Sequence, residues 1–148
     1  MNILADTCFW ISLCDSSQKD HSETEAMMEK ILAEKRHTIL VPHPVLYETL
    51  CSEMVKKPNQ VLILTRIFRS VVKVPDSEYF EEACRLVEQQ ASENRGTASM
   101  VDFSIMLMAD DPRNNVRAIL TRNGRDFGVF CNKRGMPMIE NMAILEAV

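Results

Sequence analysis

Residues 1–10 read Met-Asn-Ile-Leu-Ala-Asp-Thr-Cys-Phe-Trp, and this stretch decides the fold. Its apolar run begins at Ile3, is short and branched, and ends on the turn-forming pair Asp6-Thr7. These features predict a buried first strand, which we place in the middle of a parallel sheet. Asp6, the only charged side chain of the stretch, then lies at the carboxyl edge of the sheet, where open α/β sheets bind ligands. An Asx-type turn explains Asp6 equally well.

The length and composition fit one soluble globular domain. The chain has 148 residues, 46% of them hydrophobic, so we expect a single domain over residues 1–148. No apolar run reaches the roughly 20 residues that a membrane-spanning helix needs, and the N-terminus lacks the features of a signal peptide. Five cysteines without a Cys-x-x-Cys pair predict neither a disulfide framework nor a zinc knuckle, and they indicate a reducing cytoplasm.

The charge argues against a general nucleic-acid coat protein, because the net charge is −4. A local basic surface remains compatible with it. Basic residues gather in the C-terminal third of the chain, where the alternative interpretation is an ordinary solvated face. They are Arg113, Arg117, Arg122, Arg125, Lys133 and Arg134.

Further strands and helices alternate along the chain. Short β-prone runs predict strands at 38–41, 71–74, 116–121 and 136–139, the last at a sheet edge because Pro137 has no N–H. Amphipathic or apolar patterns predict helices at 22–36, from Pro44, from Pro58, from Ser77, through 105–109 and from Asn141. We expect a short helical turn or loop at 11–20 and a short turn around Phe127. The order predicts an α/β fold with a mainly parallel, twisted central sheet.

Three further acids fall where the predicted strands end or the following helices begin. Glu48 lies one turn into the helix after the second strand, Asp102 is the one charge inside the most apolar helix, and Asp126 follows strand 116–121. Each has a structural explanation. Glu48 favours the helix dipole, Asp102 forms a capping box with Ser99, and Asp126 caps a short turn.

Four acids at one edge of a sheet need a common reason. Two unpaired carboxylates about 4 Å apart repel by roughly 4 kcal/mol at an effective dielectric of 20, so such a cluster calls for a cation. Oxygen ligands without histidine or cysteine at metal spacing select hard ions such as Mg²⁺ or Mn²⁺. Those ions serve reactions at phosphate by polarising its oxygens and activating water.

Four segments taken together resemble the PIN-domain ribonucleases, particularly the toxins of bacterial toxin–antitoxin pairs. They are Ile-Leu-Ala-Asp-Thr at 3–7, Pro-Val-Leu-Tyr-Glu at 44–48, Asp102 ahead of the apolar run 105–109, and Leu-Thr-Arg-Asn-Gly-Arg-Asp-Phe at 120–127. The resemblance implies a three-layer α/β/α fold, an Mg²⁺- or Mn²⁺-dependent endoribonuclease and a homodimer. It also implies a cognate antitoxin whose C-terminal segment blocks the acids. Cys8 and Asn123 depart from the pattern, which often has Ser or Asn at the first position and Asp at the second.

The resulting hypothesis assigns a role to each candidate residue. One or two divalent ions are held by the four acids, and water attacks a scissile RNA phosphate in line, leaving a 3′-hydroxyl and a 5′-phosphate. Supporting groups orient the water and the acids, and two arginines follow the RNA backbone. The acids are Asp6, Glu48, Asp102 and Asp126, the supporting residues are Thr7, Thr121 and Asn123, and the RNA-binding residues are Arg122 and Arg125.

Two alternatives remain. The first is a PIN fold that is catalytically weak or inactive and serves as an RNA-binding or interaction module. The second is an aspartyl-phosphate enzyme or receiver that uses Asp6 on the same architecture. Phosphatases of that kind need Asp-x-Asp after the first strand, whereas this chain has Cys8, and its one candidate receiver lysine, Lys133, follows a different pattern.

Overall fold

Five parallel strands form one sheet in the computed structural model, which describes residues 1–51, 53–94, 96 and 98–148. The sheet order is β3-β2-β1-β4-β5, so β1 lies at its centre and β5 at an edge, as the sequence predicts. All four strand pairs are parallel. The strands are β1 (Asn2–Ala5), β2 (Thr38–Pro42), β3 (Val72–Val74), β4 (Val116–Leu120) and β5 (Met138–Ile139).

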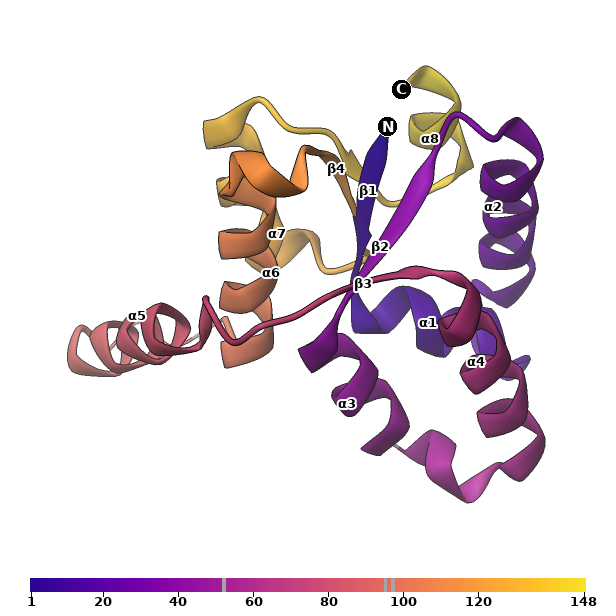
Figure 1. Cartoon of the computed structure of the whole chain (residues 1–148), viewed down its shortest axis with the longest axis horizontal. Helices are drawn as coiled ribbons and strands as arrows, with labels where there is room; N and C mark the ends of the chain where they lie inside the picture. Colours follow the sequence, from indigo (N-terminus) through magenta and orange to yellow (C-terminus); the bar gives the residue numbers. More distant parts are fainter. Residues whose placement is uncertain (52, 95, 97) are drawn as a thin grey trace.

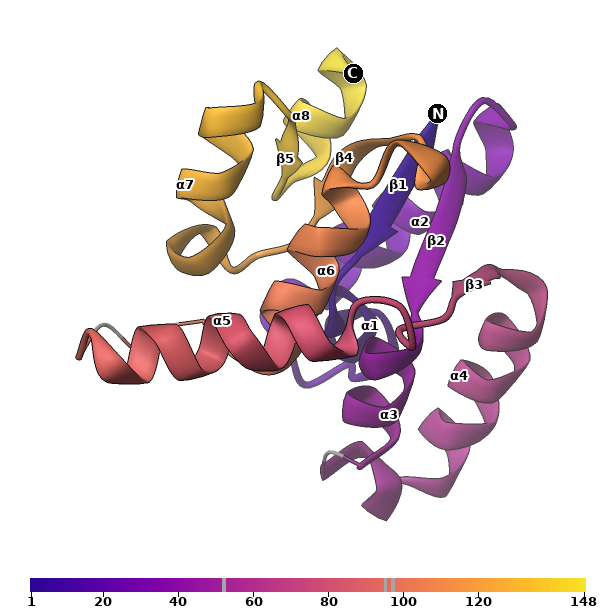
Figure 2. The ribbon, with the colours of Figure 1, turned by 60° about the vertical axis from the view of Figure 1, so that its left-hand side comes forward.

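Helices cover the sheet on both sides, which gives the three layers expected. Figure 1 shows α2 on one side of the strands and α6 with α7 on the other, while α5 packs on α6 and projects away from the sheet in both ribbon views (Figure 2). The helices are α1 (Thr7–Cys14), α2 (His21–Glu34), α3 (His43–Cys51), α4 (Pro58–Ser70), α5 (Phe80–Ser92), α6 (Met100–Asp110), α7 (Gly124–Arg134) and α8 (Met142–Ala147), with 3₁₀ turns at Glu53–Lys56 and Pro112–Asn114.

Strand β1 ends where the turn-forming pair Asp6-Thr7 predicts, but a helix stands in the first part of the short helical turn or loop predicted at 11–20 and reaches Cys14, while residues 15–20 form turns. Strand β1 ends at Ala5 and helix α1 begins at Thr7, so Phe9 and Trp10 are helical. Their apolar side chains face the core in a helix whose Ser12 and Cys14 are buried as well. A helix that is buried on several sides has no amphipathic period, and its sequence therefore gives no helical pattern that would predict it.

Helix α7 replaces the short turn predicted around Phe127. It runs for 11 residues from Gly124 and ends on Gly135, whose φ of 61° is in the left-handed region that favours glycine. Only Phe127 and Cys131 of this helix are buried. Two apolar contacts at i and i+4 are too few for a helical pattern to stand out in the sequence.

The core lies around β1 and α1. Ile3, Leu4 and Ala5 are fully buried, as expected for a central strand covered on both faces. Trp10 packs edge-on against Phe68 of α4, with ring centroids 5.1 Å apart. This packing fixes α1 directly beneath the carboxyl end of β1.

The strand order reverses at β1, which places a ligand-binding crevice there. From β1 the chain builds β2 and β3 on one side, and β4 and β5 lie on the other. Open α/β sheets bind ligands at the carboxyl ends of the strands beside such a reversal. Ala5 pairs with Leu120, so Asp6 and Thr121 follow adjacent strands at this point. Among the described helices, none has the length and apolar character needed to cross a membrane.

Candidate active site

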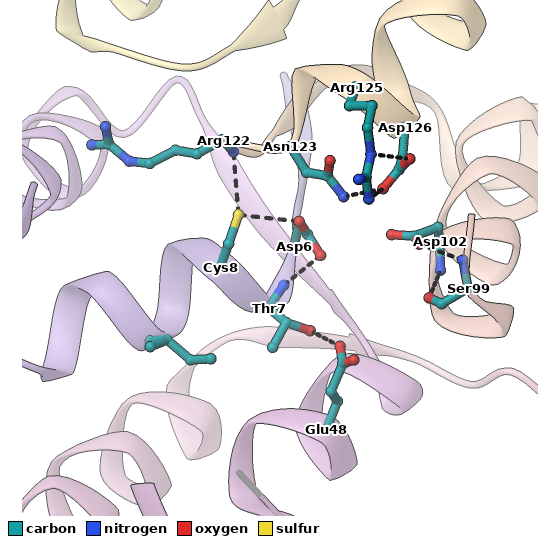
Figure 3. A pocket seen from close by; sticks show the side chains of 11 residues that line it. Asp6, Thr7, Cys8, Glu48, Ser99, Asp102, Arg122, Asn123, Arg125 and Asp126 are labelled. Atoms are coloured by element: carbon teal, nitrogen blue, oxygen red, sulfur yellow. Dashed lines mark hydrogen bonds and ion pairs between the residues drawn. The ribbon is translucent and has the colours of Figure 1, made fainter. Parts of the chain in front are cut away.

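A cavity of about 730 Å³ opens at this carboxyl edge, and the four acids named from the sequence line it. They come from the β1–α1 junction, from α3 and from the first turns of α6 and α7. Figure 3 shows their side chains around one space. The lining residues are Asp6, Thr7, Cys8, Ile11, Glu48, Ser99, Asp102, Arg122, Asn123, Arg125 and Asp126.

Asp6 serves as the N-cap of α1 and also faces this cavity. Its Oδ1 accepts the Thr7 N–H at 2.6 Å, and its Oδ2 accepts the Thr121 hydroxyl at 2.8 Å. Asp6 therefore folds back on the following backbone as the structural explanation expects, although it does so through the next N–H and not through the one two residues on that defines an Asx turn. Only 5% of Asp6 is exposed. Burial raises the pKa of its carboxyl despite these hydrogen bonds, and the charge of Asp102 raises it further.

Glu48 is held by a supporting residue that the sequence named. The Thr7 hydroxyl donates a hydrogen bond to Glu48 Oε2 across the space between α1 and α3. The Thr7 main chain meanwhile donates to Asp6. Thr7 therefore fixes two of the acids relative to each other.

Asp102 has the predicted structural role and a place in the cavity at the same time. Ser99 Oγ accepts the Asp102 N–H at 3.1 Å, and Asp102 Oδ2 accepts the Ser99 N–H at 2.6 Å, which completes a capping box. Asp102 is 9% exposed. The cap uses Oδ2, and Figure 3 shows the other carboxylate oxygen of Asp102 pointing into the cavity toward Asp6.

Asp126 is surrounded by donors. Asn123 Nδ2 donates to its Oδ2 at 2.7 Å, and the Arg125 guanidinium contacts both carboxylate oxygens, at 3.1 and 3.2 Å. Arg125 is the largest cause of the lowered pKa of Asp126, and Asn123 contributes. Thr121 Oγ1 accepts the Asn123 N–H at 3.0 Å, so Thr121 links Asp6 to the loop that carries Asn123.

Arg122 is placed differently from Arg125. Its guanidinium pairs with Asp20 at 2.6 Å and with Glu23 at 3.2 Å at the start of α2. Figure 3 shows the side chain directed away from the acids. In this arrangement Arg122 ties the loop after β4 to α2, and only Arg125 of the two arginines faces the acids.

Cys8, Ser99 and Ile11 complete the lining but were not assigned to the site from the sequence. The Cys8 thiol donates to Asp6 Oδ2 at 3.1 Å and accepts the Arg122 N–H at 3.2 Å. Burial, and then the Asp6 charge, raise the pKa of Cys8 to about 12, so the thiol stays protonated. The capping box was a usable signal for Ser99, because it puts Ser99 within one turn of Asp102.

The carboxylate oxygens of the cavity are suitable ligands for a hard divalent cation, although the acids are not arranged around a single ion position. Within the described ranges, no three histidine, cysteine, aspartate or glutamate side chains are arranged to hold a metal ion. Glu48, Asp102 and Asp126 each contact a protein donor instead, namely Thr7, Ser99 and Arg125. A cation would nonetheless relieve the buried Asp6 and its repulsion from Asp102, and carboxylate oxygens suit Mg²⁺ or Mn²⁺.

Comparison with known proteins gives a fold match. No protein-family model matches the sequence, and a search of curated proteins finds no match. Among solved structures, the Mycobacterium tuberculosis toxin VapC20, which cleaves the sarcin-ricin loop, matches with a TM-score of 0.64 and 16% identity over 86% of this chain and 94% of that one. The chain has a PIN-like fold. VapBC2 from Rickettsia felis, bound to a DNA fragment from its promoter, matches with a TM-score of 0.65 and 16% identity over 93% and 97% of the two chains.

The PIN-like fold confirms the architecture that the resemblance implies: a central parallel sheet between two layers of helices. At 16% sequence identity, the two matches show a shared fold and not a shared activity. What the cavity does therefore depends on its own side chains.

Proposed function

We propose that this protein is a divalent-metal-dependent endoribonuclease and the toxin of a toxin–antitoxin pair, acting in the cytoplasm. The observation that carries the proposal is the meeting of Asp6, Glu48, Asp102 and Asp126 at one cavity, from four separate segments of a PIN-like fold. The sarcin-ricin loop cleavage by VapC20 supports RNA as the substrate class.

The four carboxylates are the groups that would hold Mg²⁺ or Mn²⁺. A bound cation of this kind polarises phosphate oxygens and lowers the pKa of water. Asp6 and Asp102 are the inner pair because both are buried and their charges interact. Glu48, which is exposed, and Asp126 flank them from α3 and α7.

The surrounding side chains orient these acids and the substrate. Thr7 positions Glu48, Thr121 positions Asp6, and Asn123 positions Asp126, each through a direct hydrogen bond. Arg125 is 75% exposed in its side chain, so its guanidinium can contact a phosphate from the position in which it pairs with Asp126. In the reaction, the water oxygen bonds to phosphorus, the P–O3′ bond breaks, and a proton passes to the departing 3′ oxygen.

A nuclease assay with purified protein tests this proposal. Wild-type protein is expected to cleave end-labelled RNA with Mn²⁺, to stop with a chelator, and to leave 5′-phosphate and 3′-hydroxyl ends. Asp6→Asn is expected to be inactive. Asp110→Asn is the matched control because Asp110 is an exposed acid of α6 that pairs with Arg134 outside the cavity. Equal cleavage by wild type and Asp6→Asn would exclude the proposed chemistry.

A second candidate is a PIN-like interaction module without a metal. It is favoured by the arrangement of the described acids, no three of which are placed to hold an ion. The two candidates differ in thermal stability, since a ligand at 100 times its dissociation constant adds about 2.7 kcal/mol to the free energy of unfolding. No change in melting temperature with Mn²⁺ or Mg²⁺ would favour the module.

The proposed partners are an antitoxin and a second copy of the chain. The VapBC2 match supports the first, because the chain of similar fold was solved there within a VapBC complex. Co-expression with the product of the adjacent reading frame tests it: a cognate antitoxin is expected to co-purify and to suppress cleavage. Light scattering of the purified chain tests the homodimer.

A further inference from the structure

A second cavity adjoins the acidic one. It has a volume of about 380 Å³ and lies between α3, the segment before α5 and the first turns of α6. Glu48 lines both cavities, so the two lie next to each other at this side chain. The lining is mainly apolar, and its residues are Pro44, Tyr47, Glu48, Cys51, Asp76, Phe80, Met100, Val101 and Ser104.

This second cavity gathers the exposed aromatic surface of the protein. Of the aromatic side chains that the structure describes, Tyr47 at 60% and Phe80 at 46% are the exposed ones. Both line this cavity. The others, including Trp10 and Phe127, are buried or half-buried. Leaving two aromatic faces in water beside the candidate active site costs hydrophobic free energy, which a ligand that covers them would recover.

We propose that this cavity binds one unpaired nucleobase of the RNA, next to the phosphate that lies over the acids. The inference rests on the proposed function and adds a substrate subsite to it. Proteins that read single-stranded RNA stack splayed bases on exposed aromatic rings. A volume of about 380 Å³ is within the range of small-ligand sites.

The elements hold the two rings in fixed relation to the acids. Tyr47 directly precedes Glu48 on α3, so the base site and the nearest acid share one helix. The His43 ring lies 6.1 Å from the Tyr47 ring, centroid to centroid, one turn earlier on the same helix. Phe80 begins α5, and its N–H donates to the Asp76 carbonyl at 3.0 Å. That bond fixes Phe80 against the segment that brings Asp76 to the cavity rim.

A binding experiment separates this subsite from catalysis. The probe is a fluorescein-labelled single-stranded RNA of mixed sequence and roughly 12 nucleotides, within the usual length of single-strand sites. Its affinity is measured by anisotropy in the Asp6→Asn background, which prevents cleavage. Tyr47→Ala and Phe80→Ala are each expected to weaken binding about 5- to 150-fold, the effect of losing one stacked base. Tyr47→Phe retains the ring and is expected to bind normally.

The matched control is Leu62→Ala on α4, because Leu62 is an equally exposed apolar residue, at 67%, outside the cavity. Circular dichroism melting of every variant shows that it is folded. A series of RNAs, each with one abasic position at a different place in the strand, locates the bound base. We expect Asp6→Asn protein to bind one member of the series more weakly than the intact RNA. The same protein with Tyr47→Ala added is expected to bind that member and the intact RNA equally.

Three outcomes overturn the subsite. Unchanged RNA affinity in both aromatic variants removes it. Loss of a dimer in light scattering with unchanged RNA affinity assigns the cavity to a second copy, and loss of antitoxin binding alone assigns it to a protein partner. Wild-type cleavage alongside any of these leaves the nuclease proposal standing, whereas a wild type that neither binds nor cleaves RNA defeats that proposal itself.

Discussion

Arg125 occupies the position of a counter-ion to Asp126. Its guanidinium contacts both oxygens of that carboxylate, and the charges of Asp126 and Asp102 raise the pKa of Arg125. A divalent cation must compete with this ion pair. We expect Arg125→Ala to bind Mn²⁺ about two- to fivefold more tightly, consistent with the modest strength of an exposed pair. Calorimetric titration of Mn²⁺ measures the change.

Arg134→Ala is the control for this effect, because Arg134 pairs with Asp110 at 2.6 Å outside the cavity lining. Its affinity for Mn²⁺ is expected to match that of the wild type. Weaker Mn²⁺ binding by Arg125→Ala would contradict the competition.

Thr7 is the residue through which Glu48 is oriented. Thr7→Val keeps the shape of the side chain and removes the hydroxyl that donates to Glu48. Loss of a group that orients a metal ligand typically costs about 10–100-fold in metal affinity or activity. We expect that loss in Mn²⁺ titrations of Thr7→Val and recovery in Thr7→Ser. Equal affinities for the two variants would assign Thr7 to packing alone.

At the scale of elements, Asp102 joins helix capping to the candidate chemistry, and two substitutions separate the roles. Asp102→Asn retains a side-chain oxygen to accept the Ser99 N–H, whereas Asp102→Ala removes it. We expect Asp102→Ala to lower the free energy of unfolding by about 0.5–1.5 kcal/mol, the usual net value of the hydrogen bond that the Ser99 N–H loses. Asp102→Asn is expected to stay near the wild type in urea unfolding while both variants lose nuclease activity.

The loop after β4 depends on Arg122 for its position. Because Arg122 pairs with Asp20 and Glu23 of the α2 start and is only 24% exposed in its side chain, Arg122→Ala leaves acceptors without a partner. We expect a loss of about 1–3 kcal/mol in the free energy of unfolding. Arg85→Ala, which breaks an exposed pair within α5, is expected to change it far less. Unfolding by urea provides both values.

The sequence predicts where the helices and strands lie along the chain better than it predicts which distant residues contact one another. The strands predicted at 38–41 and 116–121 end within one residue of the observed β2 and β4, because each is a β-prone run with turn signals on both sides. Helix α1 was missed since its buried sides remove any amphipathic period. The partners of Arg122 lie about 100 residues away in sequence, and nothing local to Arg122 indicates them. The four acids were found because parallel strands bring their carboxyl ends to one edge.

At the scale of the whole molecule, the buried Asp6 links global stability to pH and to the cation. Burial raises the pKa of folded Asp6 above its unfolded value of 3.8. The folded state therefore favours the protonated acid. The contribution of Asp6 to the free energy of unfolding is therefore fully present below the unfolded pKa, and it is lost as the pH rises through the folded pKa. Wild-type protein without a cation thus has a penalty at neutral pH that Asp6→Asn avoids.

We therefore expect Asp6→Asn to melt a few degrees above the wild type at pH 7 in a chelator, and this difference to shrink as the pH falls toward the unfolded pKa. Saturating Mn²⁺ is expected to reverse the order, because it stabilises the wild type by about 2.7 kcal/mol at 100 times its dissociation constant and leaves Asp6→Asn nearly unchanged. Calorimetric melting across pH, with and without Mn²⁺, measures both effects. A wild type that is more stable than Asp6→Asn at pH 7 without a cation would mean that the Thr7 and Thr121 hydrogen bonds outweigh burial, and that Asp6 needs no metal to be kept ionised.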